Sequence, residues 1–397
     1  MKKSYLVCLS LLASFYAMAQ EDSLGGMNMD AVYERPFLYN AYDRISVGGY
    51  LETHLEYKGE EGVNEGYSFD ARRFTVFMSG QIAPRISFFS ELEYEHGTEE
   101  IAIEFAAIDL QIHPALNIRG GVIMNPIGAF NQNHDGPKWL FVERPEMAVN
   151  LLPATFSNPG FGVFGKWRFG KTVLGYEAYL SNGFDGSIID NEEGKTFLPA
   201  VKENPGRMGG SGNGALFTSG KISLKNPVFG ELGFSHLGGV YNRFEGDGLV
   251  LDEKRRMDAI ALDYSKSFEK TSTLLRAEFT RIFIDIAENY DESYGENQSG
   301  FYLDLEQVIL NPELRAWPDA KVMVGLRFDY VDWNRDEFPF GQGEIGDELY
   351  AGSFALAFRP VSQTVLRLNY RRQLNVDLLN NPPTRGGAWF LGLSTYF

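Results

Sequence analysis

Apolar and polar residues alternate along most of the chain beyond residue 44. In 363–375, four apolar residues occupy one set of alternate positions and four polar residues the other: Leu366, Leu368, Tyr370 and Leu374 against Arg367, Asn369, Arg371 and Gln373. A period of two is typical of β-strands with one apolar and one polar face. The pattern predicts an all-β chain with sixteen strands, at 44–57, 69–81, 84–95, 99–112, 115–124, 160–169, 172–182, 214–225, 228–240, 254–267, 271–284, 299–310, 320–332, 347–359, 363–375 and 386–397.

The connections between these strands alternate between tight turns and long polar loops. Short links such as Pro84-Arg85 and Gly170-Lys171 are followed by long ones, expected at 58–67, 125–157, 183–213, 241–253, 286–298, 333–346 and 376–386. The link 311–319 is the exception, because it is long for the turn side. Short turns at one end and long loops at the other are typical of a bacterial transmembrane antiparallel β-barrel. An even number of strands places both termini on the periplasmic side, where the turns lie.

Two packed sheets would show the same alternation, so the chain end helps to decide between the two architectures. Trp389, Leu391, Leu393, Thr395 and Phe397 alternate to the last residue. This segment resembles the C-terminal signal by which outer-membrane barrels are recognised by their assembly machinery, with Phe397 as its terminal residue. The alternative is an edge strand of a soluble sheet. A closed barrel is favoured because it pairs every backbone group, as a membrane requires.

Two predicted strands break the alternation. Arg281 falls in phase with Phe279 and Phe283, so either it faces outward at the level of the lipid headgroups or a bulge shifts the phase. In 99–112, the apolar phase changes between Phe105 and Ile108, which leaves the side of Glu104 undecided.

The first nineteen residues have the features of a cleaved export signal. Lys2 and Lys3 precede an apolar run, and Ala17-Met18-Ala19 matches an A-x-A cleavage site. Cys8 lies inside the apolar run, too early for a lipid-anchored start. We therefore divide the chain into a signal peptide (1–19), a periplasmic leader (20–43) and a single barrel domain (44–397).

Composition excludes several classes of function. Loss of Lys2 and Lys3 with the signal would shift the net charge from −17 to −19, which argues against a nucleic-acid partner. Cys8, the single cysteine, would leave as well, so neither a disulfide nor a thiolate metal site is expected. The five histidines are scattered and show no metal-ligand spacing: His54, His96, His113, His134 and His236. We expect no metal and no cofactor.

The long connection 125–157 is richer in aromatic and apolar residues than an exposed loop usually is. Loops of this length in compact folds are commonly functional. It is the third long loop, the one that narrows the lumen in sixteen-stranded porins. We therefore expect it to form a pore constriction, with these polar candidates: Asn131, His134, Asp135, Lys138, Glu143 and Arg144. The alternative is an ordinary surface loop or a subunit contact.

One part of the chain resembles a known family. Arg119-Gly120-Gly121-Val122 and Asn125-Pro126, followed by Asn133-His134-Asp135 and Glu143-Arg144-Pro145, are similar to the phosphate-selective porin O and P family. The likeness covers about 100–165. It implies a sixteen-stranded porin that passes small solutes passively and forms a homotrimer. Family members that select phosphate carry runs of inward arginines and clustered lysines.

The inward-facing positions of the predicted strands carry charges of both signs. The basic candidates for the pore wall are Arg73, Arg119, Arg276, Arg327, Arg359, Arg367 and Arg371. The acidic candidates are Glu91, Glu93, Glu177 and Asp329. Arg367 and Arg371 lie on one strand face and would form a short basic track. Wall charge sets pore selectivity by its sign, so the wall either selects anions such as phosphate or pairs its charges internally.

Three functions are compatible with these features of the sequence. The first is an outer-membrane porin for passive diffusion of small solutes or ions, with membrane lipid and the barrel assembly machinery as partners. The second is a non-conducting barrel with a structural or surface-assembly role. The third is a barrel enzyme, for which His134-Asp135 would supply part of a triad. No serine has a nucleophile-elbow context, so we expect a protein that is not an enzyme.

Overall fold

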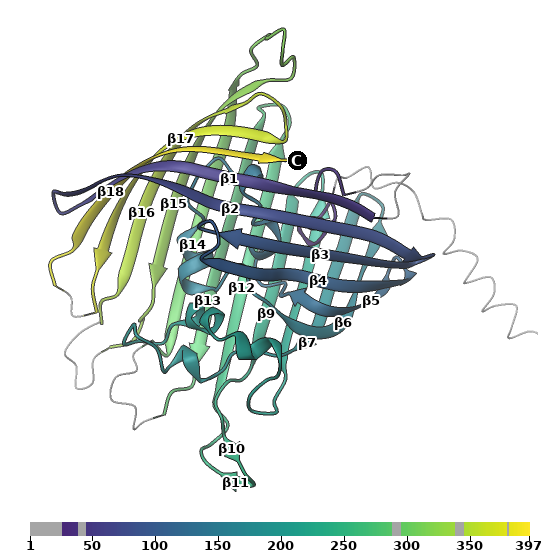
Figure 1. The fold of residues 1–397 in the computed structure, drawn as a ribbon, viewed down its shortest axis with the longest axis vertical. Coiled ribbons are helices and arrows are strands. Elements are labelled where there is room, and N and C mark those ends of the chain that lie inside the picture. The colour runs from purple at the N-terminus through teal and green to yellow at the C-terminus, as the bar shows by residue number, and fades with distance from the viewer. Residues whose placement is uncertain (1–25, 39–44, 288–294, 338–344, 379–380) are drawn as a thin grey trace, which may run out of the picture.

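The computed structural model describes residues 26–38, 45–287, 295–337, 345–378 and 381–397 (Figure 1). The predicted signal peptide 1–19 lies outside this part of the chain, as do 20–25 and 39–43 of the predicted leader.

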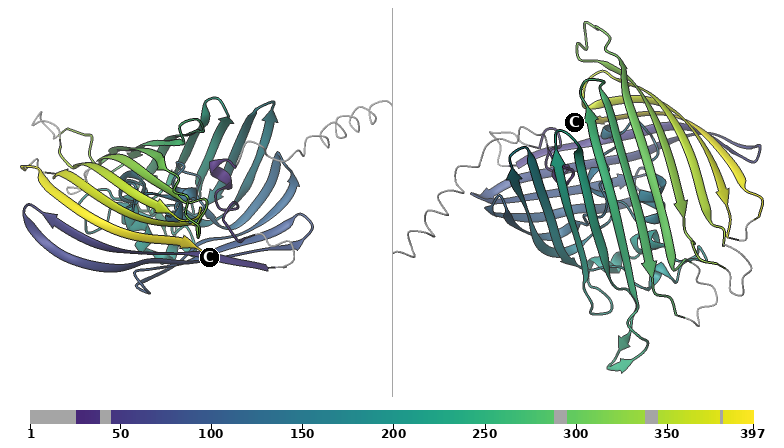
Figure 2. Two further views of the ribbon diagram at one scale, coloured as in Figure 1. Left: turned by 90° about the horizontal axis from the view of Figure 1, so that it is seen from above. Right: turned by 180° about the vertical axis from the view of Figure 1, so that it is seen from behind.

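Sixteen strands form one closed barrel in which each strand pairs with its neighbours in the chain (Figures 1 and 2). The strands of the ring are β1 (Ile45–Glu60), β2 (Val63–Ala83), β3 (Ile86–Glu95), β4 (Glu100–His113), β5 (Leu116–Met124), β6 (Ser157–Phe169), β7 (Thr172–Ser181), β8 (Phe217–Asn226), β9 (Gly230–Val240), β12 (Arg256–Phe268), β13 (Thr273–Ile284), β14 (Asn297–Leu310), β15 (Lys321–Asp332), β16 (Glu348–Arg359), β17 (Thr364–Val376) and β18 (Thr384–Tyr396). Antiparallel pairing of β1 with β18 closes the ring. The prediction of a sixteen-stranded antiparallel barrel is confirmed, and the two-sheet alternative is wrong.

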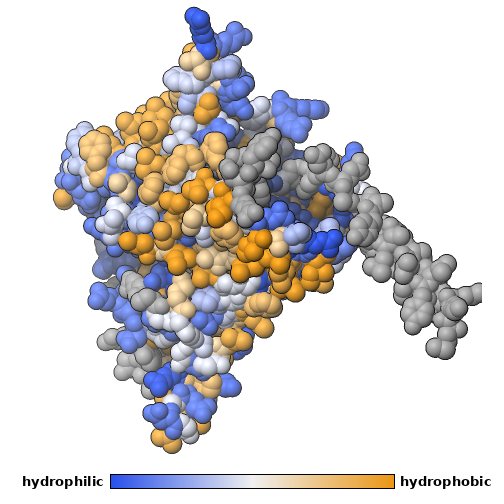
Figure 3. Space-filling view, turned by 45° about the vertical axis from the view of Figure 1, so that its right-hand side comes forward, coloured by the Kyte–Doolittle hydropathy of each residue, from blue (hydrophilic) through white to orange (hydrophobic). Residues whose placement is uncertain are grey.

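The alternation along each strand separates an apolar outer face from a polar inner face. On β17, Leu366 and Leu368 are more than 40% exposed on the outside, whereas Arg367 and Asn369 are buried on the inside. Apolar residues predominate over the middle of the face in Figure 3, and hydrophilic residues gather at the protruding ends. In the described ranges, no helix is long and apolar enough to cross a membrane.

The first hairpin is longer than its sequence indicated. We expected a polar loop at 58–67, but β1 continues to Glu60 and β2 begins at Val63, so a two-residue turn joins them. Glu61 and Gly62 both have positive φ, at 47° and 82°. Two such residues form the type of turn whose twist matches that of the paired strands. The polar residues at the end of β1 and the start of β2 remain in strand conformation because they pair with each other across the hairpin, and not because they are buried.

The two phase breaks have different causes. Between β3 and β4 the register shifts so that Glu104 is the extra residue of a β-bulge, and its side chain is buried on the inner side. Strand β13 has no such shift at Arg281, which keeps the outward phase of Phe279 and Phe283. The structure thus places Glu104, whose side was undecided, on the inner side, and the bulge that was one alternative for Arg281 is wrong.

The two ends of the barrel carry different connections. The short hairpin β10 (Glu245–Gly246) and β11 (Leu249–Val250) lies within the predicted loop 241–253 and projects from the end where the long loops lie. The link between β14 and β15 projects from the opposite end (Figure 1) and contains an isolated bridge between Leu314 and Trp317. We call these the loop end and the turn end.

Gly121 lies where β4 and β5 approach each other closely. Its φ is 137°, and a Cβ atom there would lie 2.2 Å from the carbonyl oxygen of Ala106. We expect Gly121→Ala to lower the free energy of unfolding by at least about 1–3 kcal/mol, the usual cost of a sparsely populated backbone conformation. Gly352→Ala is the matched control, because nothing lies within 4 Å of its Cβ position. Equal stability of the two refolded variants in urea would contradict this expectation.

A candidate pore and the segments inside it

The loop between β5 and β6 lies inside the barrel and bonds to strands around the ring. On β17, Arg367 donates to the carbonyl oxygens of Trp139 (2.9 Å) and Phe141 (2.7 Å). On β8, Lys221 donates to the carbonyl oxygen of Gly128 at 2.7 Å. Loop residues 125–156 are therefore bonded to walls on different sides of the bore.

Local structure and apolar packing hold this loop in place. Short helical turns occur at Asn131–Asn133, Gly136–Lys138 and Met147–Leu151. Asn131 links the two ends of the loop, because its side chain donates to the carbonyl oxygens of Asn125 (2.7 Å) and Phe156 (3.0 Å). Apolar residues of the loop join inner-wall residues of β12 and β13 in one buried cluster that includes Phe130, Met147, Phe156, Ala259 and Ile282.

The connection between β7 and β8 adds to the same cluster. Its residues Phe184, Ile188, Leu198 and Val201 are buried with those of the β5–β6 loop. The rings of Phe184 and Phe156 stack with centroids 4.7 Å apart. The main apolar cluster of the described residues thus lies inside the ring near β8, β9 and β12–β16. Smaller clusters hold the loop against β17 and β18, where Phe141 is buried with Val365, and Val142 with Phe390.

The N-terminal segment also lies inside the ring. We expected 20–43 to be a leader in the periplasm, but its described residues 26–38 enter the turn end of the bore, as the purple segment in Figure 2 shows. The backbone N–H of Asn28 donates to Glu231 at 2.9 Å, and Tyr33 donates to Asp109 at 2.8 Å. Lys166 pairs with Asp30. This position has a physical reason, because buried wall carboxylates need hydrogen-bond donors and the segment supplies them.

Arg35 joins the N-terminal segment, the loop and the wall. Its guanidinium donates two bonds to Asp135, at 3.0 and 2.7 Å, and lies 2.9 Å from Glu91 of β3. All three side chains are at most 1% exposed. Burial alone would raise the pKa of Asp135, but Arg35 and Lys138 outweigh it and hold that pKa below its ordinary value. The negative charge of the buried Asp135 carboxylate is therefore balanced by the neighbouring cations Arg35 and Lys138.

The other constriction candidates lie on the same inner surface. His134 contacts Glu91 at 3.1 Å through Nε2, and its Nδ1 lies 2.9 Å from the carbonyl oxygen of Asn131. Lys138 donates to the carbonyl oxygen of Ala31 at 3.2 Å. Arg144 lies 3.8 Å from Glu93. The partners of the two ring nitrogens of His134 are thus a backbone carbonyl and a carboxylate, and neither is the hydroxyl that a catalytic triad would place there.

Each basic wall candidate lies on the inner side and bonds to a carboxylate or a carbonyl oxygen. Arg73 donates to Glu52 and Glu95, Arg119 to Asp109, and Arg276 to Glu306. Arg327 donates to Asp304 and to the carbonyl oxygen of Glu143, and Arg359 donates to the carbonyl oxygen of Pro137. Arg367 donates to Glu52 and to carbonyl oxygens of the loop, and Arg371 donates to Glu146. Arg367 and Arg371 thus hold the loop and form no open basic track. Arg359 differs from the rest because it forms no ion pair with the described residues.

The acidic wall candidates also have partners. Glu93 accepts from Tyr50 (2.7 Å) and Thr75 (2.8 Å). Glu177 accepts from Gln132 at 2.9 Å, and Asp329 accepts from the backbone N–H of Glu146 at 3.1 Å. Glu91 bonds to Arg35 and His134, as described above. The acidic wall residues thus bind the two internal segments as well.

The last residue completes the closing strand. Phe397 exchanges two backbone hydrogen bonds with Gly49 of β1, at 3.1 and 3.0 Å. Its ring is 47% exposed and stacks on Phe74 with centroids 5.8 Å apart. The terminal phenylalanine is therefore part of the seam that closes the barrel.

Cavities open on the bore from both ends. The turn-side cavity, about 870 Å³, is lined among others by Lys138, Arg276, Glu306, Lys321 and Arg359. The loop-side cavity, about 240 Å³, is lined by residues that include Lys58, Glu60, Glu143, Glu146 and Arg371. Loop residues 138–146 lie between them.

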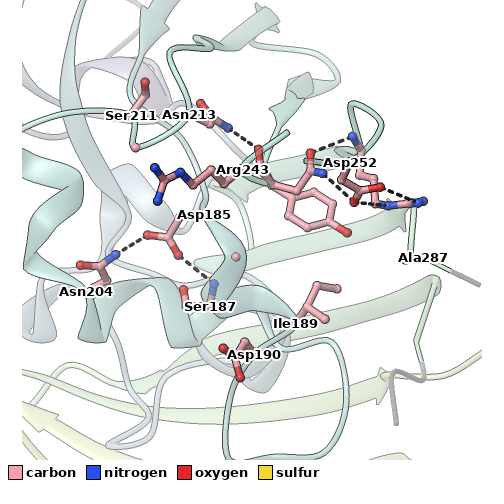
Figure 4. A pocket seen from close by; sticks show the side chains of 15 residues that line it. Asp185, Ser187, Ile189, Asp190, Asn204, Ser211, Asn213, Arg243, Asp252 and Ala287 are labelled. Atoms are coloured by element: carbon pink, nitrogen blue, oxygen red, sulfur yellow. Dashed lines mark hydrogen bonds and ion pairs between the residues drawn. The ribbon is translucent and has the colours of Figure 1, made fainter. Parts of the chain in front are cut away.

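A third cavity lies among the long loops (Figure 4). It measures about 530 Å³ and is lined by residues of the β7–β8 and β9–β12 connections and by Ala287, which follows β13. Its polar groups bond to one another: Asp185 accepts from Ser187 and Asn204, and Arg255 donates to Asp252.

The sequence reasoning missed several of the residues that organise the bore. Glu52 lies in the inward phase of its strand, so period two could have found it. Arg35 lies in a segment without periodicity, and no local pattern marks it. The grouping of His54 with Glu56 and Glu143 was also missed, because the three residues come from two distant parts of the chain.

Comparison with known proteins supports the fold class. No protein-family model matches the sequence. An uncharacterized protein of Aquifex aeolicus is 30% identical over 198 residues, which span 48% of this chain and 43% of that protein. The chain therefore covers less than half the length of this relative.

Solved porin structures have the same architecture. An anion-selective porin from Comamonas acidovorans matches with a TM-score of 0.54 and 12% identity over 89% of this chain and 99% of that one. OprB of Pseudomonas putida (0.52, 10%, 89% and 94%) and the outer membrane channel DcaP of Acinetobacter baumannii (0.51, 11%, 90% and 99%) also match. The chain has the fold of the sixteen-stranded outer-membrane porins. This agrees with the porin fold that the sequence resemblance implied, whereas membership of the phosphate-selective porin O and P family is not shown.

The Arg35 ion pairs predict a large effect on stability. We expect Arg35→Met to lower the free energy of unfolding by about 3–5 kcal/mol, because it removes the arginine partner of buried Glu91 and leaves buried Asp135 with Lys138 alone. Adding Asp135→Asn should restore part of the loss by removing one of those charges. Urea unfolding of the single and double variants measures both effects. The control is Arg85→Met at an exposed turn, and an equal loss in this control would contradict the assignment.

Proposed function

We propose that this protein is an outer-membrane porin through which small solutes or ions diffuse passively. The observation that carries the proposal is a closed barrel whose outer face is apolar and whose inner face is charged, with the β5–β6 loop folded into the bore. An apolar exterior suits a membrane, and a hydrated, charged interior suits solute passage. Export by a signal peptide and residence in the outer membrane belong to the same proposal.

The two cavities mark the ends of the solute path in this proposal. The turn-side cavity opens beside β13–β16, and the loop-side cavity opens beside β1, β17 and β18. Loop residues 138–146 separate the two cavities and would form the constriction. The loop's hydrogen bonds to Arg367 and Asn369 support a fixed constriction over a mobile one.

Anion preference, including phosphate, is the finer part of the proposal. It is supported by the turn-side cavity, where the basic residues Lys138, Arg276, Lys321 and Arg359 outnumber the acidic residues Glu306 and Asp319. Arg359 donates to the carbonyl oxygens of Pro137 and Ser362 and has no carboxylate partner among the described residues. Its charge is therefore available to a passing anion.

Assembly is also part of the proposal. One of the matched structures is a trimer form of OmpT of Vibrio cholerae, with a TM-score of 0.52 and 9% identity, and a homotrimer is proposed here by analogy. Recognition by the barrel assembly machinery through the strand that ends at Phe397 is supported by the exposed ring of that residue. The proposal includes no catalytic role.

A non-conducting barrel is the second candidate, and one observation favours it. Residues 26–38, the β5–β6 loop and part of the β7–β8 connection all lie inside the ring. A bore filled from both ends would suit a barrel with a structural or surface-assembly role. Electrical recording separates the two candidates.

Removal of the N-terminal segment should widen the path. We expect deletion of 26–38 to raise single-channel conductance in planar bilayers by roughly a factor of two, since the segment occupies the turn-end opening and pore width sets conduction. Shortening the β10–β11 hairpin, which lies away from the bore, is the control. If the full chain and the deletion variant are both folded and silent, the structural role is correct and the porin proposal is wrong.

The charge of Arg359 should set ion preference. We expect Arg359→Gln to reduce the anion-to-cation permeability ratio by roughly a factor of two, because wall charges select by sign. Reversal potentials in asymmetric salt, with chloride and then phosphate, measure this ratio. Arg315→Gln is the control, since Arg315 is exposed on the β14–β15 link. An unchanged ratio in Arg359→Gln would show that this cavity does not select the solute.

A further inference from the structure

A histidine and two carboxylates meet where the β5–β6 loop contacts the first strand. His54 and Glu56 belong to β1, and Glu143 belongs to the loop. One side-chain ligand atom of each lies within 4.8 Å of those of the other two. His54 Nε2 is 3.5 Å from Glu56 and 3.9 Å from Asp70, its cross-strand partner on β2.

His54 is buried and unsatisfied. Its side chain is 1% exposed, and among the described residues neither ring nitrogen has a hydrogen-bond partner. A buried polar group without a partner is costly, and its persistence calls for an explanation such as an ion or a ligand. The ring packs against Phe390, with centroids 5.9 Å apart, so it cannot turn freely toward solvent.

The carboxylates beside it are suited to a cation. Glu143 lines the loop-side cavity and presents its carboxylate next to His54 and Glu56. Glu56 is bonded to Lys58, whose ammonium lies 2.8 Å away and whose side chain is 41% exposed. A flexible, exposed lysine can be displaced by a divalent ion that offers the carboxylates more charge.

A second group of one histidine and two carboxylates differs from the His54 group because an arginine already supplies its positive charge. Among the described residues, Glu91, Glu93 and His134 also bring ligand atoms within 4.8 Å of one another. There, Arg35 lies 2.9 Å from Glu91 and supplies the positive charge. In the His54 group, the Glu143 carboxylate forms no ion pair with the part of the chain that the structure describes, so the place beside His54 remains open to a cation.

We propose that His54, Glu56 and Glu143 form a binding site for a divalent transition metal ion of the Zn²⁺ class. One imidazole nitrogen and two carboxylate oxygens are a donor set that such ions accept. Tetrahedral ligands lie ~3.4 Å apart for bonds of about 2.0–2.1 Å, so Glu56 and Glu143 must close on the ion by side-chain rotation. The loop-side cavity, lined by Lys58, Glu143 and Phe390, gives the ion access.

The bound ion would tie the loop to the wall. Glu143 is part of the β5–β6 loop, and its two partners are on β1, so coordination cross-links the two at the loop end of the bore. The ion would add to the apolar packing of Val142 against Ala388 and Phe390 of β18. This consequence for stability does not depend on whether the barrel conducts.

Calorimetric titration of the refolded, chelator-treated full chain with ZnCl₂ in detergent tests the site. We expect one saturable site in the low micromolar range, weakened about tenfold or more by His54→Ala, as is usual when a metal site loses a supporting group. Glu143→Gln, which keeps the shape and removes the charge, should weaken binding in the same direction. His236→Ala is the control, because His236 lies in an exposed pair with Asp258.

Three results would overturn the proposal: no saturable binding to the wild type, unchanged affinity in both His54→Ala and Glu143→Gln, or equal loss in His236→Ala. Hydrogen exchange of the loop provides a second readout. Zn²⁺ should slow exchange around Glu143 in the wild type and not in His54→Ala, and equal protection in both would also contradict the site. Since neither measurement uses conduction, failure of the porin proposal and failure of this one remain distinguishable.

Discussion

The structure depends on the pairing of charges inside a closed ring. Every second residue of each strand faces the bore, and many of these residues are charged and nearly inaccessible to solvent. A buried charge is tolerated when it is paired and hydrogen-bonded. The bidentate pairs of Arg119 with Asp109 and of Arg327 with Asp304 satisfy this condition between neighbouring strands. Other wall charges need partners that the strands do not supply.

Those missing partners come from the two segments that enter the ring. Arg35 supplies the cation for Glu91 of the wall and Asp135 of the loop. The loop in turn offers carbonyl oxygens to Arg367 and backbone N–H groups to Glu278. A loop in the interior must satisfy its own backbone groups, so wall and loop each meet a requirement of the other. The same bonds therefore hold the loop in the bore and satisfy the charged side chains of the inner wall.

The interior combines apolar and polar contacts. Toward β8–β16, Phe130, Met147 and Phe184 pack with apolar wall residues as in a soluble core. Toward β17 and β18, the loop both packs through Val142 against Phe390 and accepts hydrogen bonds from Arg367. Apolar burial and hydrogen bonds thus fix the loop together, and the cavities at the turn end and the loop end leave room for water and solutes.

The sequence by itself determined the barrel. The period of two depends only on whether each residue is apolar or polar. It was enough to predict the sixteen strands and their inward-facing charged residues, including Arg327 and Asp329. Glycine-containing turns such as Glu61-Gly62 are also local, although their polar flanks indicated a loop and proved to be strand. Only the tertiary structure decided the partners of the charges, and with them the place of residues 26–38. Arg35 and Asp135 lie 100 positions apart, and Arg367 and Glu52 lie 315 apart. Such pairs form when ring closure brings distant strands and loops together, so no local sequence pattern identifies the two partners.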